Sequence, residues 1–535
     1  MYGYQQEENQ MNKPNVIFIY ADDLGRGMLS CYGQKQFETP NIDCLAEEGL
    51  SFENSYGCHI CAPARASFMC GVHDSHCGKW QFTRAGIYKD YARGKLTLEQ
   101  VYELIHNTGI EERSGDCFLP MVFRQAGYVT GQIGKLEWGF ATTGDAIKAH
   151  GWDYHYGYYD HEMCHGYYPP FMFENGNRVD IPGNLHPDCG AEQYSKETFQ
   201  KNGDDIEQGR AVYSQDLFDE KIREFLFRHK DEPFFLLHPS QLPHGRLSIP
   251  RIHPQMECRE DLTLSEKIYA SMVLRLDETV GKILDWLDEF GLSENTIVVF
   301  ASDNGHCCYY NSQRTGRPGD VSVTGQKVDN IHIPFTSKEF GDVFDGNNGM
   351  SGSKSSNFEG GTRVPLIFRW PEKIRHGRTQ RLVANYDFMA TMAEMLGTSA
   401  GEGKDGVSYW PLLAGREEDF REHDYVVYAS TRGPALVTKD GWKLRSCITD
   451  GYRFGQFGAF WEEIEGQVLF ELYDLKNDYR EEHDLAAQYP EKTRQLRALL
   501  MKECDGNVVH GTTQSHFVFY GYDYRNAIRE SEAKA

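Results

Sequence analysis

The sequence lacks an uninterrupted apolar run long enough to span a membrane. Its beginning, MYGYQQEENQMNKPNVIFIY, has neither the basic start nor the long apolar core of a secretory signal peptide. We therefore expect a cytoplasmic protein without a membrane partner, although a secreted protein trimmed of its leader would show the same pattern. The sequence also contains no internal repeat and no low-complexity tract.

Positive charge is in deficit. The chain has 55 Lys and Arg residues against 79 Asp and Glu residues, which gives a formal net charge of −24. Such an acidic protein is not expected to bind nucleic acid or an acidic membrane surface as its main partner. A small anionic substrate remains possible, because a local cluster of cations can form in an acidic protein.

The cysteine spacing of a thiolate zinc site is missing. Cys58 and Cys61 form a Cys-x-x-Cys pair, but no second pair at zinc spacing follows. A redox pair is one alternative, yet it would not require the proline and arginine that follow. The 14 cysteines in 535 residues are typical of a large reduced protein rather than of a small disulfide scaffold.

The stretch Cys61-Ala-Pro63-Ala-Arg65 begins a good helix-forming run that ends at Gly71. Pro63 forbids a helix interior at its own position and pushes Ala62 toward an extended backbone, so we predict that Cys61 lies just before a helix N-terminus with Arg65 one turn further on. Free backbone N–H groups and the helix dipole favour negative charge there. The pattern predicts a site for an anion, or for a nucleophile that attacks one. A buried structural thiol is the alternative for Cys61 taken alone.

Two apolar, strand-like runs end in metal-ligand side chains. NVIFIYADD ends in Asp22 and Asp23, and TIVVFASDNG contains Asp303 and Asn304. Carboxylate and amide oxygens at neighbouring strand ends predict a hard cation site, suited to Ca²⁺ or Mg²⁺ rather than zinc. A solvated turn is the alternative for Asp22 and Asp23, because DDLG has turn composition.

The run CAPARASFMCG resembles the Cys-x-Pro-Ser/Ala-Arg signature of type I sulfatases, arylsulfatase-like members of the alkaline phosphatase superfamily. Three further motifs are similar in the same order: GKLEWG with Lys135, the Pro-His pair ending at His244, and GMSGSKSSNFEGGTRVP with Lys354. The resemblance covers most of the chain.

The resemblance implies a mechanism. Cys61 would be oxidised by a formylglycine-generating maturase, and its aldehyde hydrate would attack sulfur beside a bound Ca²⁺ (Mg²⁺ being possible). Lys135, Lys354 and Arg65 would hold the sulfate, and His244 would protonate the leaving oxygen. The implied metal ligands are Asp22, Asp23, Cys61 as formylglycine, Asp303 and Asn304.

One position departs from the family. Glu137 stands where sulfatases usually carry the histidine that removes a proton from the hydrate. We hypothesise that Glu137 is itself the base; alternatively, the role has moved to another residue and Glu137 anchors Lys135 or Arg65. His161 and His165, in an aromatic segment resembling the substrate entrance, are candidates for contact with the leaving group.

Strands alternating with helices predict a mixed, mostly parallel sheet sandwiched by helices, and the resemblance implies alkaline-phosphatase-like topology. We predict a catalytic α/β domain at 1–400 and a small antiparallel-sheet subdomain with a helix at 401–535.

The predicted function is hydrolysis of a carbohydrate, aryl or alkyl sulfate ester. A phosphonate monoester or phosphodiester hydrolase and a non-catalytic binder of sulfated glycans are the alternatives. The sequence does not indicate an oligomeric state.

Overall fold

The structure is a computed structural model. It describes residues 13–76, 85–108, 117–190, 209–310, 320–321, 325, 327–328, 335–371, 373–428, 433–448, 468–504 and 506. No helix within these ranges is long and apolar enough to cross a bilayer.

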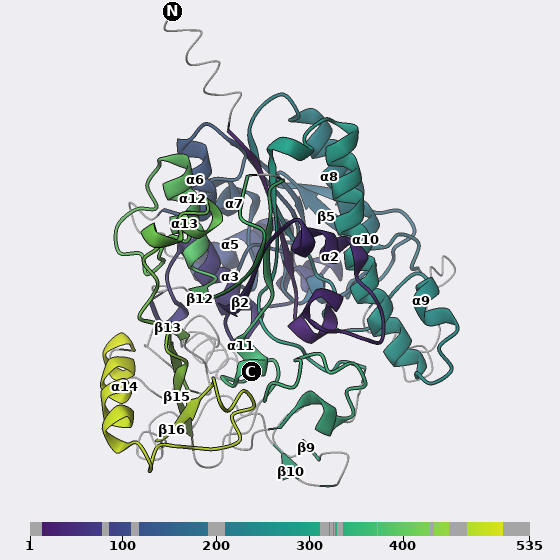
Figure 1. The fold of residues 1–535 in the computed structure, drawn as a ribbon. Helices are drawn as coiled ribbons and strands as arrows, with labels where there is room; N and C mark the ends of the chain where they lie inside the picture. The colour runs from purple at the N-terminus through teal and green to yellow at the C-terminus, as the bar shows by residue number, and fades with distance from the viewer. Residues whose placement is uncertain are drawn as a thin grey trace, which may run out of the picture.

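A 10-stranded sheet forms the centre of the molecule (Figure 1). Its strands, in sheet order, are β12 Gly377–Ala384, β2 Gly49–Tyr56, β11 Leu366–Arg369, β8 Thr296–Ser302, β1 Asn15–Ala21, β7 Phe234–Pro239, β3 Val129–Gly134, β4 Tyr154–Gly157, β5 Phe171–Glu174 and β6 Asn177–Asp180. The neighbours from β8 to β4 are all parallel, whereas β11, β5 and β6 pair antiparallel with their neighbours. This mixed, mostly parallel sheet confirms the predicted fold class.

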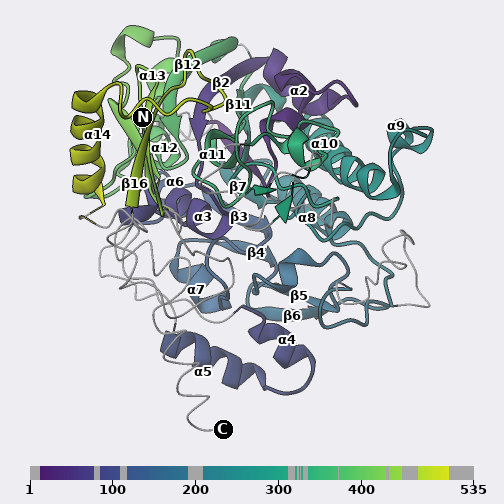
Figure 2. The ribbon, with the colours of Figure 1, turned by 90° about the horizontal axis from the view of Figure 1, so that it is seen from below.

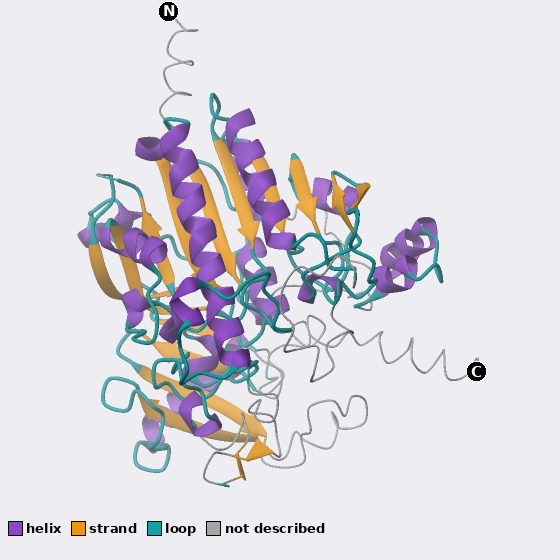
Figure 3. Ribbon diagram, turned by 90° about the vertical axis from the view of Figure 1, so that its right-hand side faces the viewer, coloured by secondary structure: helices purple, strands orange, loops and turns teal. Residues whose placement is uncertain are grey.

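Helices cover both faces of the sheet, which explains why β1 and β8 are buried along their whole lengths. Figure 1 shows α8 and α10 on one face and α6 and α12 on the other, and Figure 3 shows helices packed against the strands. The helices are α2 Pro40–Glu47, α3 Cys61–Cys70, α4 Ile87–Ala92, α5 Leu98–Thr108, α6 Leu119–Gln125, α7 Gly144–Ala149, α8 Ser214–Arg228, α9 Pro254–Glu257, α10 Leu264–Glu289, α11 Glu359–Thr362, α12 Asp387–Leu396, α13 Trp410–Leu413 and α14 Pro490–Glu503.

A smaller antiparallel sheet carries α14 on one face (Figure 2). Its strands are β13 Tyr425–Tyr428, β14 Ala435–Thr438, β15 Trp442–Ile448 and β16 Val468–Asp474, and a separate short pair is formed by β9 Asp320–Val321 and β10 Lys327–Val328. Its other face shares one apolar cluster with the large sheet, in which Tyr56 of β2 stacks on Tyr428 of β13. The boundary near residue 400 stays a prediction.

Helix α3 begins at Cys61 and ends at Gly71, whose φ of 65° gives the left-handed C-cap that glycine favours. Every residue of α3 is buried. Phe68 fixes the helix against the sheet, since its ring lies 4.6 Å from that of Phe18 in β1 and 5.4 Å from that of Phe388 in α12. The position of Cys61 therefore depends on aromatic packing at the other end of its helix.

Phe68→Ala should lower the free energy of unfolding by about 3–5 kcal/mol, because it opens a cavity among packed rings. Phe227→Ala is the matched control: Phe227 is 58% exposed and should cost less than about 0.5 kcal/mol. Urea unfolding followed by tryptophan fluorescence measures both variants. Equal losses in the two variants would show that Phe68 does not anchor α3.

Candidate active site

The carboxyl ends of four adjacent parallel strands form the floor of the candidate site. In sheet order, β8 leads into Asp303 and Asn304, β1 into Asp22 and Asp23, β7 towards His244, and β3 into Lys135. Parallel strands place their carboxyl ends at one edge, which is where open α/β sheets bind ligands. Residues 280 positions apart in the chain therefore meet, as the 3.0 Å hydrogen bond from the Asp23 N–H to Asp303 Oδ1 shows.

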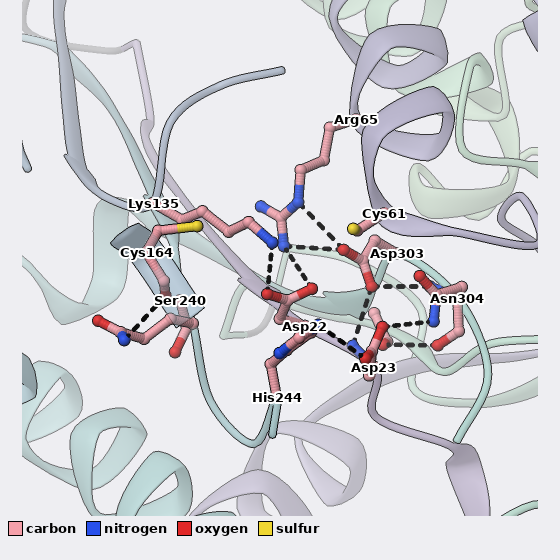
Figure 4. A network of polar contacts seen from close by, with 12 residues as sticks. Asp22, Asp23, Cys61, Arg65, Lys135, Cys164, Ser240, His244, Asp303 and Asn304 are labelled. Carbon is pink, nitrogen blue, oxygen red and sulfur yellow. Dashed lines mark hydrogen bonds and ion pairs between the residues drawn. The ribbon is translucent and has the colours of Figure 1, made fainter. Parts of the chain in front are cut away.

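Three buried carboxylates are interleaved at this edge with the buried cations Arg65 and Lys135, as Figure 4 shows, and with the partly buried Lys354. Lys135 Nζ lies 2.6 Å from Asp22 Oδ2, and Arg65 Nη2 lies 2.8 Å from Asp303 Oδ2. Lys354, from the loop before α11, places Nζ 2.7 Å from Asp23 Oδ2. These ion pairs offset the free-energy cost of burying the charged groups, which would be large if the groups were unpaired.

The carboxylates respond differently to this environment. Burial raises the pKa of Asp22 and Asp23, but the cations outweigh it: Lys135 holds the pKa of Asp22 below its usual range, and Lys354 does the same for Asp23. Burial raises the pKa of Asp303 to about 7, because the charges of Asp22 and Asp23 add to it against Arg65. Three carboxylates thus face three fixed cations, so the charges of the site are close to balance.

Cys61 faces this cluster from the first turn of α3. Its Sγ lies within 4.8 Å of carboxylate oxygens of Asp22 and Asp303, and the residue is only 3% exposed. Burial, opposed by Lys135 and Lys354, raises the pKa of its thiol to about 11. Cys58 turns away and contacts Asp74 Oδ2 at 2.9 Å, so the two cysteines do not form a redox pair in this structure.

Three histidines line the other side of the site. The rings of His165 and His244 stack at 3.7 Å, and His161 meets His165 edge-on at 4.7 Å. Lys354 Nζ lies 3.0 Å from His244 Nε2, and Lys135 Nζ lies 3.3 Å from His165 Nε2. Burial and the neighbouring cations lower the pKa of all three, to about 4 for His244, so the rings are neutral at neutral pH.

The structure corrects the placement of Glu137. Its carboxylate is buried away from the cluster, where it accepts hydrogen bonds from His150 Nδ1 and, at 2.6 Å, from Trp152 Nε1. It contacts neither Lys135 nor Arg65, so neither the role of base nor the role of anchor fits this geometry, whereas a base at another residue does. The other predicted site residues do come together.

Two contacts were not predicted from the sequence. His161 Nε2 lies 3.7 Å from Cys61 Sγ, which places this ring nearest to the predicted nucleophile among the histidines. Tyr309 donates a hydrogen bond to Asp23 Oδ2, and Lys354 Nζ lies 3.1 Å from its hydroxyl. The only available signal for Tyr309 was its position shortly after Asp303 and Asn304.

The comparisons with known proteins agree with this arrangement. The sulfatase family model matches residues 14–398, and a model described as N-sulphoglucosamine sulphohydrolase, C-terminal, matches 352–506. The fold and site thus define a sulfuric ester hydrolase. This chain belongs to the sulfatase family, which confirms the resemblance.

Individual relatives are distant but cover nearly the whole chain. An N-acetylgalactosamine-6-O-sulfatase of Bacteroides thetaiotaomicron is 27% identical over 92% of this chain and 94% of its own. A solved structure from work on glycosaminoglycan metabolism by Bacteroides thetaiotaomicron has a TM-score of 0.65 at 24% identity, covering 92% of this chain and 99% of its own. Another, solved with its substrate D-glucosamine-2-N,6-O-disulfate, has a TM-score of 0.58 at 20% identity, covering 92% and 98%. At these identities the two structures establish the fold alone.

Glu137→Gln should lower the free energy of unfolding by about 1–3 kcal/mol, because it weakens two buried hydrogen bonds, while turnover per folded molecule stays near wild type. A double-mutant cycle with Trp152→Phe should give a coupling energy of about 1 kcal/mol. Urea unfolding and active-site-normalised turnover measure the two effects. Lost turnover at unchanged stability would restore Glu137 as the base.

Proposed function

We propose that this protein hydrolyses the sulfate ester of a carbohydrate to an alcohol and inorganic sulfate, using formylglycine derived from Cys61 and a bound Ca²⁺. The observation that carries the proposal is the convergence of Arg65, Lys135 and Lys354 on the carboxylates that surround Cys61. Cations fixed in this way offset the repulsion between a nucleophile and a sulfate ester. The relatives' names make a 6-O-sulfated hexosamine the first substrate to test.

The donor atoms fit a hard divalent cation. Asp22 Oδ1 and Asn304 Oδ1 are buried oxygens that accept no hydrogen bond from the described residues. Together with Asp23 and Asp303 they form an all-oxygen set, which Ca²⁺ prefers and which Mg²⁺ could also use. Burial and the adjacent carboxylates raise the pKa of Asp303, so a cation held by these oxygens would stabilise its ionised form.

The environment of Cys61 fits a modified residue better than a thiolate. A thiol whose pKa burial raises to about 11 stays protonated at neutral pH and is a poor nucleophile. Formylglycine, formed by a maturase, would supply a hydrated aldehyde as nucleophile, and Ca²⁺ would polarise the reacting oxygens. The start of α3 then points N–H groups toward the incoming anion.

The chain's own residues would bind the sulfate, transfer the proton and exclude water. Lys135 and Lys354 would bind the sulfate oxygens, while Arg65 stays fixed on Asp303. The neutral His244 ring accepts a hydrogen bond from Lys354 Nζ at Nε2, 3.0 Å away, and would relay a proton from that ammonium group to the leaving oxygen. His165, stacked on His244, would hold that ring in place and exclude water from one of its faces.

His161 replaces Glu137 as the base in this proposal. Its Nε2 lies 3.7 Å from Cys61 Sγ, the atom position that the reacting oxygen of formylglycine would occupy. Burial keeps the ring neutral by lowering its pKa well below 6.5, so Nε2 can accept a proton. The usual family position for this histidine is on the segment after β3, whereas His161 comes from the segment after β4.

Co-expression with a formylglycine-generating enzyme should change the mass of the Cys61 peptide to that of the aldehyde and switch on sulfate release from 6-O-sulfo-N-acetylgalactosamine. Peptide mass spectrometry and ion chromatography of sulfate measure the two outcomes. Cys61→Ala should abolish release, whereas Cys258→Ala, at an exposed cysteine, should not change it. A thiol that persists under competent maturation would overturn the proposal, and faster turnover of a phosphonate ester would favour the alternative hydrolase.

His161→Gln should lower kcat by about 10²- to 10⁴-fold with little change in KM, since the base acts after substrate binding. Steady-state kinetics on the matured enzyme measure both constants. Glu137→Gln is the matched control, because its carboxylate lies outside the site. If the two variants lose turnover equally, His161 has no special role as base.

A further inference from the structure

A second cluster of metal-ligand side chains lies outside the candidate active site. His73 and His76 follow the C-terminal end of α3, Asp405 precedes α13, and Glu503 is the last residue of α14. His73 is 4% exposed, and the side chains of His76, Asp405 and Glu503 are 34%, 25% and 18% exposed. Three chain segments that are remote in sequence thus bring two imidazoles and two carboxylates to one partly buried place.

We propose that these four side chains bind one Zn²⁺ ion, which joins the segment after α3 to the C-terminal helix. The proposal does not depend on sulfate hydrolysis. It also differs from the site at the strand ends, where the oxygen ligands suit Ca²⁺. Imidazole nitrogen is a preferred zinc ligand, and two histidines with two carboxylates make a complete four-ligand shell.

The spacing of the ligand atoms fits a tetrahedral site. His76 Nδ1 lies 3.0 Å from Asp405 Oδ2, and His73 Nε2 lies 3.8 Å from both Asp405 Oδ2 and Glu503 Oε2. Zinc–ligand bonds of about 2.0–2.2 Å at tetrahedral angles separate the ligands by about 3.3–3.6 Å. The two distances to Asp405 bracket that range, and the ligand atoms of His73, His76 and Asp405 all lie within 4.8 Å of one another. Glu503 lies outside that group and approaches His73, so its side chain must rotate to complete the shell.

Outer contacts orient two of the ligands. His76 Nε2 lies 3.1 Å from the backbone carbonyl oxygen of Glu503, so Nε2 carries the proton and donates it. Tyr425 Oη donates to Glu503 Oε1 at 2.9 Å, which leaves Oε2 for a metal. Hydrogen bonds of this kind hold the ligands of metal sites in their binding orientation.

The same tautomer requires a cation between His76 and Asp405. When Nε2 carries the proton of a neutral imidazole, Nδ1 presents a lone pair to carboxylate oxygens at 3.0 and 3.1 Å. Two lone pairs at this distance repel each other. Either a second proton or a metal ion must lie between them. A metal ion needs further ligands, which His73 and Glu503 supply, whereas a proton needs none.

Purified protein, freed of metal by chelation and then saturated with excess Ca²⁺ to occupy the strand-end site, should bind one equivalent of Zn²⁺ or Co²⁺. Metal content measured by inductively coupled plasma mass spectrometry should reach one per chain. Co²⁺ should give the strong visible absorption of a tetrahedral complex. Zn²⁺ should also raise the temperature of thermal unfolding.

His76→Gln and Asp405→Asn should each weaken Zn²⁺ affinity by at least about 100-fold. His483→Gln is the matched control, because His483 lies 3.8 Å from Asp478 on the surface, 75% exposed, without further ligands. Circular dichroism of the metal-free variants checks that they fold. Sub-stoichiometric binding, octahedral Co²⁺ spectra, unchanged affinity in both variants, or stabilisation that follows pH but not Zn²⁺ would each overturn the proposal.

Discussion

The structure depends on holding three carboxylates together at one sheet edge. Asp22, Asp23 and Asp303 are fully buried, and each would be too costly there as an unpaired charge. Arg65, Lys135 and Lys354 balance this charge from three different segments. The buried carboxylate oxygens suit a hard cation, and the fixed cations suit an anionic ester.

The parallel arrangement of β8, β1, β7 and β3 is the means by which the fold meets this constraint. Each strand is buried on both faces, so its register is fixed by apolar packing and its last residue arrives at a defined point. Helix α3 adds the nucleophile position from above the sheet, held by the ring of Phe68. Rigid strands and a packed helix thus position the reactive groups.

The two metal-ligand clusters lie at opposite ends of the same helix. Cys61 begins α3 beside the oxygen ligands, while His73 follows its C-cap beside Asp405. A metal at the second cluster would tie α14 and the smaller sheet to the segment that supports the nucleophile. This arrangement gives the C-terminal region a physical role in site geometry in addition to the apolar cluster that it shares with the large sheet.

Local sequence features were enough to predict the mostly parallel sheet, a helix N-terminus close to Cys61 and the residues that gather at the strand ends, whereas the structure starts α3 at Cys61 itself. These features could be predicted because apolar periodicity, proline and glycine shape the backbone near their own positions, and because each family motif is one continuous stretch of sequence. Only the tertiary structure decided that Glu137 turns to His150 and Trp152, that His161 comes within 3.7 Å of Cys61 Sγ, and that Tyr309 joins Asp23. These contacts join segments whose spacing in the chain carries no signal of their distance in space, because side-chain direction is set by packing against residues far away in the sequence.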